Sequence, residues 1–356
     1  MKICYFGDFN PDYSRNRVII RGLRENGVDV LFCHTSLRGW RGLADLRNKY
    51  RSLKEQFDIV IVGYSDSRFM VPFAKLISDK KIIWDAFYSL YDSWVWDRKL
   101  VSPKSLKAKY YWFSDWLSCK LADVILLDTS VHIDYFSKTF STKNSKFIRV
   151  FVGTVDNMFY PRSIQKTSDK FLVHFHGNFI PLQGVEYIIR AAGLLSNDDI
   201  QFQIIGRGQD YERIKKIATD LNLENITWID HVIYEELPDY INRADICLGI
   251  FGKTDKAQRV IPNKVYEAIA DAKALISAET SAMRELFTDR KDILFCRLAD
   301  PRDLADKILE LKNSDELRGK ITQGGYELFK KMATPSKTVL PLINFLDLFF
   351  RHSPRI

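Results

Sequence analysis

Short apolar runs recur along the chain, and each is followed by a stretch with the periodicity of a helix. We expect strands at 2–6, 28–33, 58–63, 81–84, 124–127 and 147–152, and then at 171–176, 201–205, 226–229, 246–250 and 274–278. Strands that alternate with helices form parallel sheets, and parallel strands that are covered on both faces are continuously hydrophobic. The pattern therefore predicts an α/β protein made of doubly wound parallel sheets.

The length of the chain and a change in its composition indicate two domains. At 356 residues the chain exceeds what one compact core usually holds. The segment 153–162 (GTVDNMFYPR) and the residues after it are polar and contain proline, which is typical of a crossing between domains. We predict a Rossmann-like domain at 1–160 and a second at 161–335. Residues 336–356 follow as a tail whose segment 338–350 is too apolar for a free end.

Composition places the chain among globular proteins, with 46% hydrophobic and 28% charged residues. No apolar run reaches the roughly 18 residues of a membrane span, and the start (MKICYFGDF) is unlike a signal peptide. The five cysteines are scattered without a C-x-x-C pair, which favours reduced thiols, a cytoplasmic location and no zinc site. The net charge of +8 permits an anionic partner, whether a nucleotide, a membrane surface or a nucleic acid.

The segment 259–278 (RVIPNKVYEAIADAKALISA) has the features of an anion site. Pro262 and Asn263 predict the start of a helix, with Asn263 as a cap. Lys256 and Arg259 lie just before this start and Lys264 lies on it, so an anion would be favoured there. One turn later, Glu267 can accept hydrogen bonds from hydroxyls close to that anion. A phosphate beside a diol indicates a nucleotide sugar, although an ordinary amphipathic helix would explain the same pattern.

Candidate residues in the first half follow its predicted strands. Ser14, Arg15 and Asn16 lie in the loop after the first strand, where we expect an acceptor-side loop. Asp85 and Asp92 follow the strand at 81–84, so either carboxylate is a candidate general base. Alternatively, residues 14–16 form a helix cap with a solvated arginine. Asp85 and Asp92 would then be helix-cap or loop carboxylates.

The segment 84–116 is crowded with aromatic residues and lysines. Aromatic rings beside basic side chains suit a membrane interface with anionic head groups, which predicts peripheral contact with an anionic membrane. The same composition could stack nucleic acid bases, or it could belong to a helix whose aromatic side is buried.

Four blocks of the second half resemble the retaining GT-B glycosyltransferases of glycosyltransferase family 4. The blocks are HGNFIPLQGVEYIIRAAGLL (176–195), IIGRGQDYERIKKIATDLNLENITWIDHV (204–232), ELPDYINRADICLGIF (236–251) and PNKVYEAIADAKALIS (262–277). This resemblance implies two Rossmann-like domains facing a cleft, with a last helix that crosses back to the N-terminal domain. It also implies donor contacts from a glycine loop, from residues near the base and from the signature helix. These residues are Gly177, Asn178, Gln183, Gly184, Arg207, Gly208, His231, Val232, Asn263, Lys264 and Glu267.

The chain departs from the family pattern at three places. Arg259 stands where the first glutamate of the Glu-x7-Glu motif is expected, with Glu267 as the second. The glycine loop has Asn178 and Gln183 where the family has an arginine and a lysine for the diphosphate. The histidine expected near the acceptor is absent. We infer that Lys256, Arg259 and Lys264 replace the lost cations, with Lys256 and Arg259 acting on the departing phosphates.

The resemblance implies transfer of a hexosyl group from a nucleoside-diphosphate sugar to an acceptor hydroxyl, with retention, in the synthesis of a cell-surface polysaccharide or glycolipid. Expected partners are the nucleotide sugar, a lipid-linked or saccharide acceptor and the inner face of the membrane. No Asp-x-Asp occurs in the chain, so we expect a metal-independent site, and we expect no cofactor. The alternatives are a nucleotide-sugar epimerase or hydrolase of the same architecture and a basic nucleic-acid-binding protein. Because lysine and arginine are spread along the chain rather than forming one track, we expect no nucleic acid partner.

Overall fold

The computed structural model describes residues 1–352 except 66, 68, 167 and 168. The last four residues of the predicted tail therefore lie outside the described part. The chain divides into unit 1, which comprises Met1–Gly153 and Thr334–Ile356, and unit 2, which comprises Thr154–Ala333.

Unit 1 contains one parallel sheet of six strands, in the order β2-β1-β3-β4-β5-β6. The strands are β1 (Lys2–Gly7), β2 (Asp29–His34), β3 (Ile59–Val62), β4 (Lys81–Asp85), β5 (Val124–Leu127) and β6 (Phe147–Arg149). The order reverses between β1 and β3, and ligands of doubly wound sheets bind at the carboxyl ends of the strands at such a reversal.

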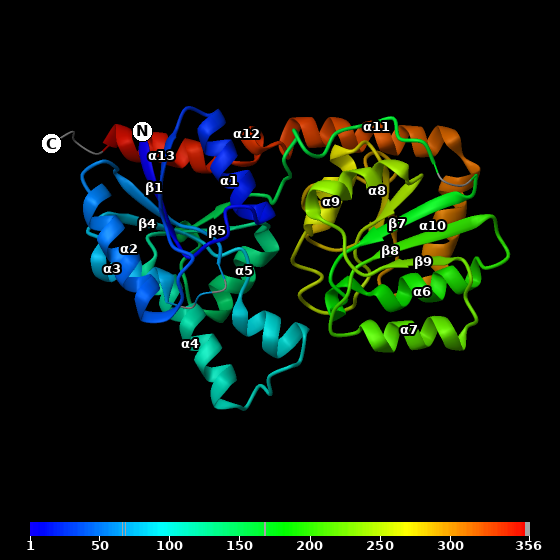
Figure 1. Cartoon of the computed structure of the whole chain (residues 1–356), viewed down its shortest axis with the longest axis horizontal. Helices are drawn as coiled ribbons and strands as arrows, with labels where there is room; N and C mark the ends of the chain where they lie inside the picture. The colour runs from blue at the N-terminus through cyan, green and yellow to red at the C-terminus, as the bar shows by residue number, and fades with distance from the viewer. Residues whose placement is uncertain (66, 68, 167–168, 353–356) are drawn as a thin grey trace. The chain divides into compact units, whose positions relative to one another are not determined.

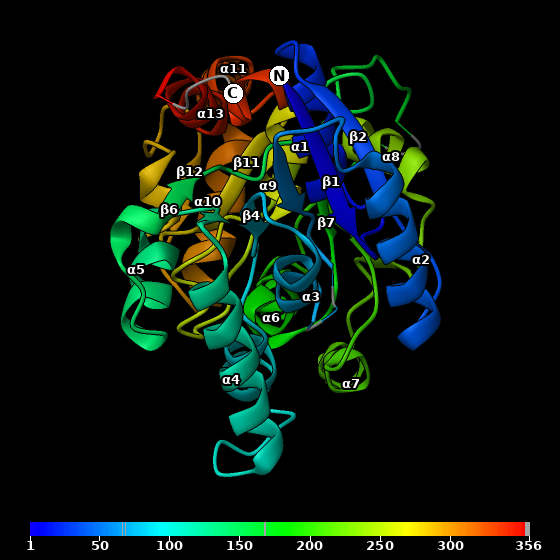
Figure 2. The ribbon, with the colours of Figure 1, turned by 90° about the vertical axis from the view of Figure 1, so that its left-hand side faces the viewer.

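Helices cover both faces of this sheet. They are α1 (Ser14–Glu25), α2 (Gly39–Leu53), α3 (Met70–Ile77), a π-helix (Asp92–Asp97), α4 (Leu106–Leu121), α5 (Ser130–Thr139), a short 3₁₀ turn (Asn144–Lys146), α12 (Pro335–Thr338) and α13 (Leu340–His352). One buried cluster joins the sheet to α2, α3, α4 and α5, and a second joins it to α1 and α13. Val339, Leu342 and Leu346 of the tail lie in the second cluster with Ile19 and Leu23, and Figure 2 shows α13 and α1 together at one end of the unit.

Unit 2 contains a second parallel sheet, in the order β12-β11-β10-β7-β8-β9. The strands are β7 (Phe171–His176), β8 (Ile200–Ile205), β9 (Ile226–Ile229), β10 (Ile246–Leu248), β11 (Ala274–Ala278) and β12 (Leu294–Cys296). Counted within the unit, this is the 3-2-1-4-5-6 order of dinucleotide-binding domains, shown from its other edge. The order reverses between β7 and β10, which directs attention to the loops that follow these two strands.

The helices of unit 2 also lie on both faces of their sheet (Figure 1). They are α6 (Val185–Leu194), α7 (Tyr211–Asp220), α8 (Leu237–Arg243), α9 (Asn263–Ala270), α10 (Pro301–Asn313) and α11 (Asp315–Met332), with 3₁₀ turns at Pro181–Gln183, Tyr234–Glu236 and Met283–Glu285. The largest buried cluster of the unit includes residues of α6, α7 and α10. Helices α8 and α9 lie on the opposite face in Figure 1, and α11 contacts α9.

The predicted fold class is confirmed, and three local predictions are corrected. Strand β12 was not predicted, although Ile293 and the three residues of the strand form an apolar run between Asp292 and Arg297. Asn263 is not the cap of α9: Pro262 occupies the cap position and Asn263 is the first helical residue. Ser14, Arg15 and Asn16 form the first turn of α1 and do not lie in the predicted loop.

All five cysteines are buried and unbridged. Within the described residues, no helix combines the length and hydropathy that crossing a bilayer requires.

Candidate functional site

The loops after β7 and β10 meet at the reversal of strand order in unit 2. A Cβ placed on Gly184 would lie 2.3 Å from the backbone nitrogen of Gly252, and one on Gly252 would lie 2.1 Å from the carbonyl oxygen of Pro181. The amide of Phe251 donates a hydrogen bond of 3.0 Å to the carbonyl of Gln183. The two loops thus touch backbone to backbone, which requires glycine at these positions.

The loop that begins at Gly177 is held in a conformation that side chains rarely adopt. Gly177 has a φ of 146°, and its amide donates to the carbonyl of Ile205 at 3.0 Å. A Cβ on Gly206, whose φ is 131°, would lie 2.1 Å from the carbonyl oxygen of Gly177. A Cβ on Gly177 itself would lie 2.7 Å from the amine nitrogen of Lys264. The backbone of this glycine loop therefore lies against a lysine from the first turn of α9.

Lys264 places a buried amine beside the glycine loop. Its amine donates to the side-chain oxygen of Gln183 and lies 3.7 Å from the ring centroid of Phe175. Burial lowers the pKa of Lys264 well below its usual range, and nearby Glu267 partly opposes this effect. The amine can therefore gain charge when an anion arrives at the glycine loop.

Glu267 lies one turn further along α9 and is 2% exposed. One carboxylate oxygen accepts a hydrogen bond from Nε2 of His176 at 2.8 Å, and the other accepts from the hydroxyl of Tyr234 at 2.9 Å. His176 immediately precedes Gly177, so the carboxylate of Glu267 and the buried amine of Lys264 both approach the first residues of one short loop. This arrangement can bind an anion and hydroxyl groups close together.

A second polar cluster follows β8 and β9. Arg207 donates to one oxygen of Asp230 and the Tyr211 hydroxyl donates to the other, each at 2.7 Å. The guanidinium of Arg207 also lies 4.6 Å from the ring centroid of Tyr211. These hydrogen bonds lower the pKa of Asp230 and raise that of Tyr211. Gly208 and His231 are exposed beside this cluster, and Val232 is half-buried.

Lys256 and Arg259 both lie in the loop between β10 and α9. Lys256 is 9% exposed and Arg259 is half-buried, and the amide of Arg259 donates to the carbonyl of Lys256 at 2.9 Å. Asn178 is exposed on the glycine loop. Of the three cations predicted for the anion site, Lys264 is the one that these contacts connect to the glycine loop.

Arg15 and Asp85 form an ion pair inside unit 1. Their charged atoms are 3.0 Å apart, and both side chains are wholly buried. Arg15 also donates to the carbonyls of Val150 and Phe151, at 2.9 and 2.8 Å. Burial raises the pKa of Asp85, and the guanidinium of Arg15 opposes the rise. This geometry favours a structural role, because Asp85 does not face solvent and Arg15 is buried in the first turn of α1 instead of lying in an open acceptor-side loop.

The other predicted residues of unit 1 are also buried. Asn16 accepts a hydrogen bond from the Tyr5 hydroxyl at 2.9 Å and donates to the carbonyls of Asn10 and Tyr64, so its side chain joins the loops after β1 and β3. Ser14 is the first residue of α1 and is 8% exposed. Asp92 begins the π-helix and is 1% exposed. None of these three side chains lies open to solvent.

Sequence reasoning missed Tyr211, Tyr234 and Gln203. Gln203 lies on β8, in register with His174 of β7, and its side chain bonds that histidine. The sequence did contain one signal, since His174 and His176 alternate on one strand and therefore share a face of the sheet. Two polar side chains on one face of a buried strand need hydrogen-bond partners. The pattern therefore predicts that neighbouring elements supply such partners.

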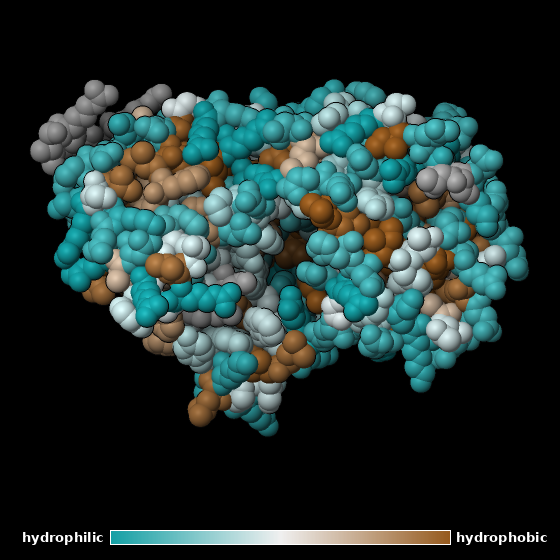
Figure 3. All heavy atoms as spheres, viewed as in Figure 1, coloured by the Kyte–Doolittle hydropathy of each residue, from teal (hydrophilic) through white to brown (hydrophobic). Residues whose placement is uncertain are grey.

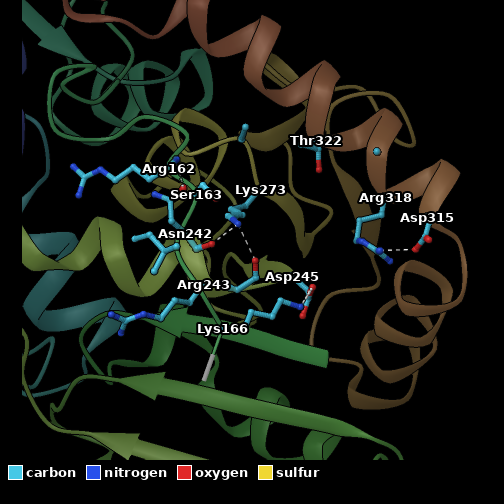
Figure 4. A pocket seen from close by; sticks show the side chains of 14 residues that line it. Arg162, Ser163, Lys166, Asn242, Arg243, Asp245, Lys273, Asp315, Arg318 and Thr322 are labelled. Atoms are coloured by element: carbon cyan, nitrogen blue, oxygen red, sulfur yellow. Dashed lines mark hydrogen bonds and ion pairs between the residues drawn. The ribbon is translucent and has the colours of Figure 1, made fainter. Parts of the chain in front are cut away.

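A hollow of about 480 Å³ lies near the amino ends of the strands of unit 2 and does not form a second site (Figure 4). Lys273 donates to the carbonyls of Asn242 and Ala244 at 2.6 and 3.0 Å, which satisfies the end of α8. Lys166 pairs with Asp245. Arg162 and Arg243 point away from the hollow in Figure 4, so its cations do not converge on a common point.

Comparison with known sequences gives a family for unit 2. Residues 156–328, just under half of the chain, match the family model described as "Glycosyl transferases group 1". An uncharacterized glycosyltransferase of Methanocaldococcus jannaschii is 26% identical over 226 residues, which cover 60% of this chain and 62% of that protein. WcaI of Escherichia coli, provisionally assigned as a colanic acid biosynthesis glycosyl transferase, is 30% identical over 112 residues, which cover 31% of this chain and 27% of WcaI. Both matches thus span less than two thirds of the relative.

Solved structures share the fold over almost the whole chain. Sucrose-phosphate synthase from Thermosynechococcus elongatus has a TM-score of 0.77 at 12% identity, and the match covers 99% of this chain and 100% of that one. Anabaena HepE, crystallised with UDP and glucose, has a TM-score of 0.72 at 13% identity, over 98% of this chain and 100% of that one. At these identities the likeness shows the fold alone, which is that of GT-B proteins.

Proposed function

We propose that this chain is a glycosyltransferase that moves a hexosyl group from a nucleoside-diphosphate sugar to an acceptor hydroxyl. The observation that carries the proposal is that Lys264 and Glu267, from one helix, both meet the start of the glycine loop. A buried amine beside backbone that accommodates no side chain suits a diphosphate. A carboxylate one turn away suits the hydroxyls of the attached sugar. The match of unit 2 to glycosyl transferases group 1 supports this assignment of roles.

In this reaction the bond between the anomeric carbon and the distal phosphate oxygen breaks, and the acceptor oxygen forms the new bond. Negative charge grows on the diphosphate as it departs. The acceptor hydroxyl gives up its proton to an oxygen of this departing diphosphate. Fixed donors and cations in a poorly hydrated site stabilise such charge, at about 3 kcal/mol per well-placed donor. Lys264, the first turn of α9 and, by proposal, Lys256 and Arg259 supply this stabilisation.

The stereochemistry, the metal requirement and the acceptor of the proposed reaction are inferred from sequence patterns and from one relative. Retention of configuration follows from the resemblance of the four sequence blocks to retaining enzymes. We propose metal independence from the absence of Asp-x-Asp, and we assign no cofactor beyond the substrate nucleotide. The acceptor we propose is a saccharide or lipid-linked saccharide of a cell-surface polymer or glycolipid, made on the cytoplasmic side. The provisional assignment of WcaI to colanic acid synthesis supports this choice.

Nucleotide sugars are expected to raise the melting temperature of the protein. A ligand at 100 times its dissociation constant adds about 2.7 kcal/mol to the stability of the state that binds it. We therefore expect at least one nucleoside-diphosphate sugar in a panel of bases and sugars to give a clear shift by differential scanning fluorimetry. For that ligand, Glu267→Gln should reduce the shift with the sugar nucleotide more than the shift with the nucleoside diphosphate alone.

Glu212→Gln, an exposed change on α7, is the matched control and should alter neither shift. Product analysis with donor alone separates a transferase from a hydrolase or epimerase, because only the latter two consume the donor rapidly without an acceptor. If no nucleotide or nucleotide sugar shifts the melting temperature, the proposed function is wrong.

We also propose that unit 1 contacts an anionic membrane through residues 98–113, which we call the projecting segment. Leu100, Leu106 and Phe113 are 55%, 82% and 50% exposed there. No acidic residue occurs between 98 and 113, and the segment contains five lysines and arginines. Figure 3 shows apolar atoms among polar ones where α4 extends from its sheet. Apolar side chains among cations suit a surface with anionic head groups, to which each cation adds about 1 kcal/mol.

Vesicle sedimentation is expected to show binding to vesicles with anionic lipid and little binding to neutral vesicles. Adding salt should weaken this binding, because the electrostatic part is screened. Replacing Leu106 and Phe113 by serine should reduce the bound fraction about 10-fold, whereas Leu194→Ser, an exposed leucine of unit 2, should not. Equal pelleting with both kinds of vesicle would contradict the electrostatic part of the proposal.

A further inference from the structure

A chain of hydrogen bonds leads from the interior of unit 2 to Glu267. Nε2 of Gln203 lies 2.7 Å from Nδ1 of His174. Nε2 of His174 lies 2.9 Å from Nδ1 of His176, whose own Nε2 lies 2.8 Å from a carboxylate oxygen of Glu267. Gln203 and His174 are buried, at 8% and 1% exposure. Three elements, β8, β7 and α9, thus contribute to one polar path.

The direction of every bond in this path follows from its inner end. The amide nitrogen of Gln203 also lies 3.4 Å from the carbonyl oxygen of Tyr240, which can only accept, so the glutamine presents its NH₂ group to His174. His174 must then accept at Nδ1 and donate from Nε2. His176 in turn accepts at Nδ1 and donates from Nε2 to Glu267. Each histidine therefore has one tautomer compatible with its neighbours.

The surroundings favour a neutral ring at His174. Burial lowers the pKa of His174 well below its usual range, and the charges of His176, Lys264 and Lys273 act in the same direction. The charged groups that face the path are these two lysines and Glu267 at its outer end. A neutral imidazole can donate through only one nitrogen, so the path cannot hold both directions at once.

We propose that Gln203, His174 and His176 are positioning residues that aim Glu267 at the hydroxyls of the donor sugar, with Gln203 setting the direction of the whole path. The inference rests on the proposed function for its ligand, a nucleoside-diphosphate sugar. His176 and Tyr234 each occupy one carboxylate oxygen of Glu267, which holds the plane of the group and leaves its remaining acceptor positions for the sugar.

Gln203→Glu is the decisive variant, because it replaces the inner donor by an acceptor of nearly the same shape. His174 must then donate from Nδ1, His176 must do the same, and Nε2 of His176 turns a lone pair toward Glu267. One proton added to the two rings restores the contact with Glu267. Nδ1 of His174 then donates to the new carboxylate at position 203 while Nε2 of His176 donates to Glu267. We expect the donor sugar to bind at least about 10-fold more weakly than to wild type at about pH 8.5, with recovery to within about 3-fold at about pH 6.

Gln201→Glu is the matched control. It makes the same change of charge on the same strand, where Gln201 bonds Thr227 at the surface, and it should bind donor like wild type at both pH values. Gln203→Met removes the inner donor without reversing the path, so it should weaken binding with no recovery in acid. Recovery in acid that is confined to Gln203→Glu distinguishes positioning from a merely structural effect.

Histidine-selective ¹⁵N NMR tests the direction of the path without any ligand, and the chain has only six histidines to assign. We expect both rings of wild type to carry their proton on Nε2, and Gln203→Glu to move it to Nδ1 or to add a second proton. Nδ1 protonation in wild type, or unchanged donor affinity of Gln203→Glu at about pH 8.5, would overturn the inference. If wild type shows these tautomers but binds no nucleotide sugar, the proposed function is wrong. The direction of the hydrogen bonds in the path would still be as described.

Discussion

Arg15→Met is expected to lower the free energy of unfolding of unit 1 by about 3–5 kcal/mol, the usual cost of breaking a buried ion pair by removing one partner. The variant leaves the carboxylate of Asp85 without its cation, and both side chains are wholly buried in wild type. It also removes the donors of two hydrogen bonds to the carbonyls of Val150 and Phe151. Methionine has a similar length, so the loss reflects charge and hydrogen bonds more than packing.

The effect is expected to grow with pH. Burial already raises the pKa of Asp85, and Arg15 opposes that rise, so the pKa should be higher still in the variant. When a carboxyl group has a higher pKa in the folded state than in the unfolded state, the free energy of unfolding falls as pH rises from the unfolded-state pKa to the folded-state pKa. The difference between wild type and variant should therefore be smallest in mild acid and largest at neutral pH and above.

Denaturant unfolding followed by tryptophan fluorescence measures this loss, because six of the seven tryptophans precede residue 117 and so lie in unit 1. Lys2→Met is the control: it breaks an exposed ion pair with Asp29 at 3.9 Å and should cost less than about 1 kcal/mol. Adding Asp85→Asn to Arg15→Met should recover part of the stability by removing the buried charge. A variant that unfolds like wild type but loses turnover would contradict the structural role and favour Asp85 as the predicted base.

The same pair shows why part of the candidate site could not be predicted. Arg15 and Asp85 are 70 residues apart, one in the first turn of α1 and the other at the end of β4. Sequence patterns equally permit a solvent-facing group at both positions. The prediction was made for each residue singly, so it could not include their mutual neutralisation. Burial of two opposite charges becomes favourable only when both are brought together, which is a property of the fold.

The fold itself was more accessible to prediction. Continuous runs such as IVIV in β3 and ALISA in β11 allow few alternatives to buried parallel strands, and the structure places them in two six-stranded sheets. The three-residue β12 was missed although it also lies in a short apolar run, 293–296. Lys264 and Glu267 were found because a single helix carries both. Gln203 was missed because its role depends on the register between β7 and β8, which no local pattern specifies.

Lys264→Met is expected to reduce turnover of the nucleoside-diphosphate sugar by about 10²–10³-fold at saturating donor, the usual loss when one well-placed charge-stabilising group is removed. The amine of Lys264 lies where a Cβ on Gly177 would approach to 2.7 Å, so it is adjacent to the backbone proposed to bind the diphosphate. Charge grows on that group as the glycosidic bond breaks. The loss should therefore appear in kcat more than in donor affinity.

The fold should tolerate this change, which separates a functional role from a structural one. Burial disfavours the charged form of Lys264, and its amine donates to the neutral oxygen of Gln183. Methionine removes the cost of burying an amine while keeping most of the packing against Phe175, so the melting temperature should stay the same or rise. Lys216→Met, an exposed change on α7, should alter neither turnover nor stability.

Donor binding to wild type should also take up a proton at Lys264. Because burial lowers the pKa of the free amine and a bound diphosphate raises it, the protein gains a proton on binding between these two values. Donor affinity should then fall as pH rises above the pKa of the free amine. Calorimetry in buffers of different ionisation enthalpy measures this uptake, which Lys264→Met should abolish. If the variant keeps the turnover and the proton uptake of wild type, the diphosphate is held by backbone groups and other cations, and Lys264 only fills space beside the glycine loop.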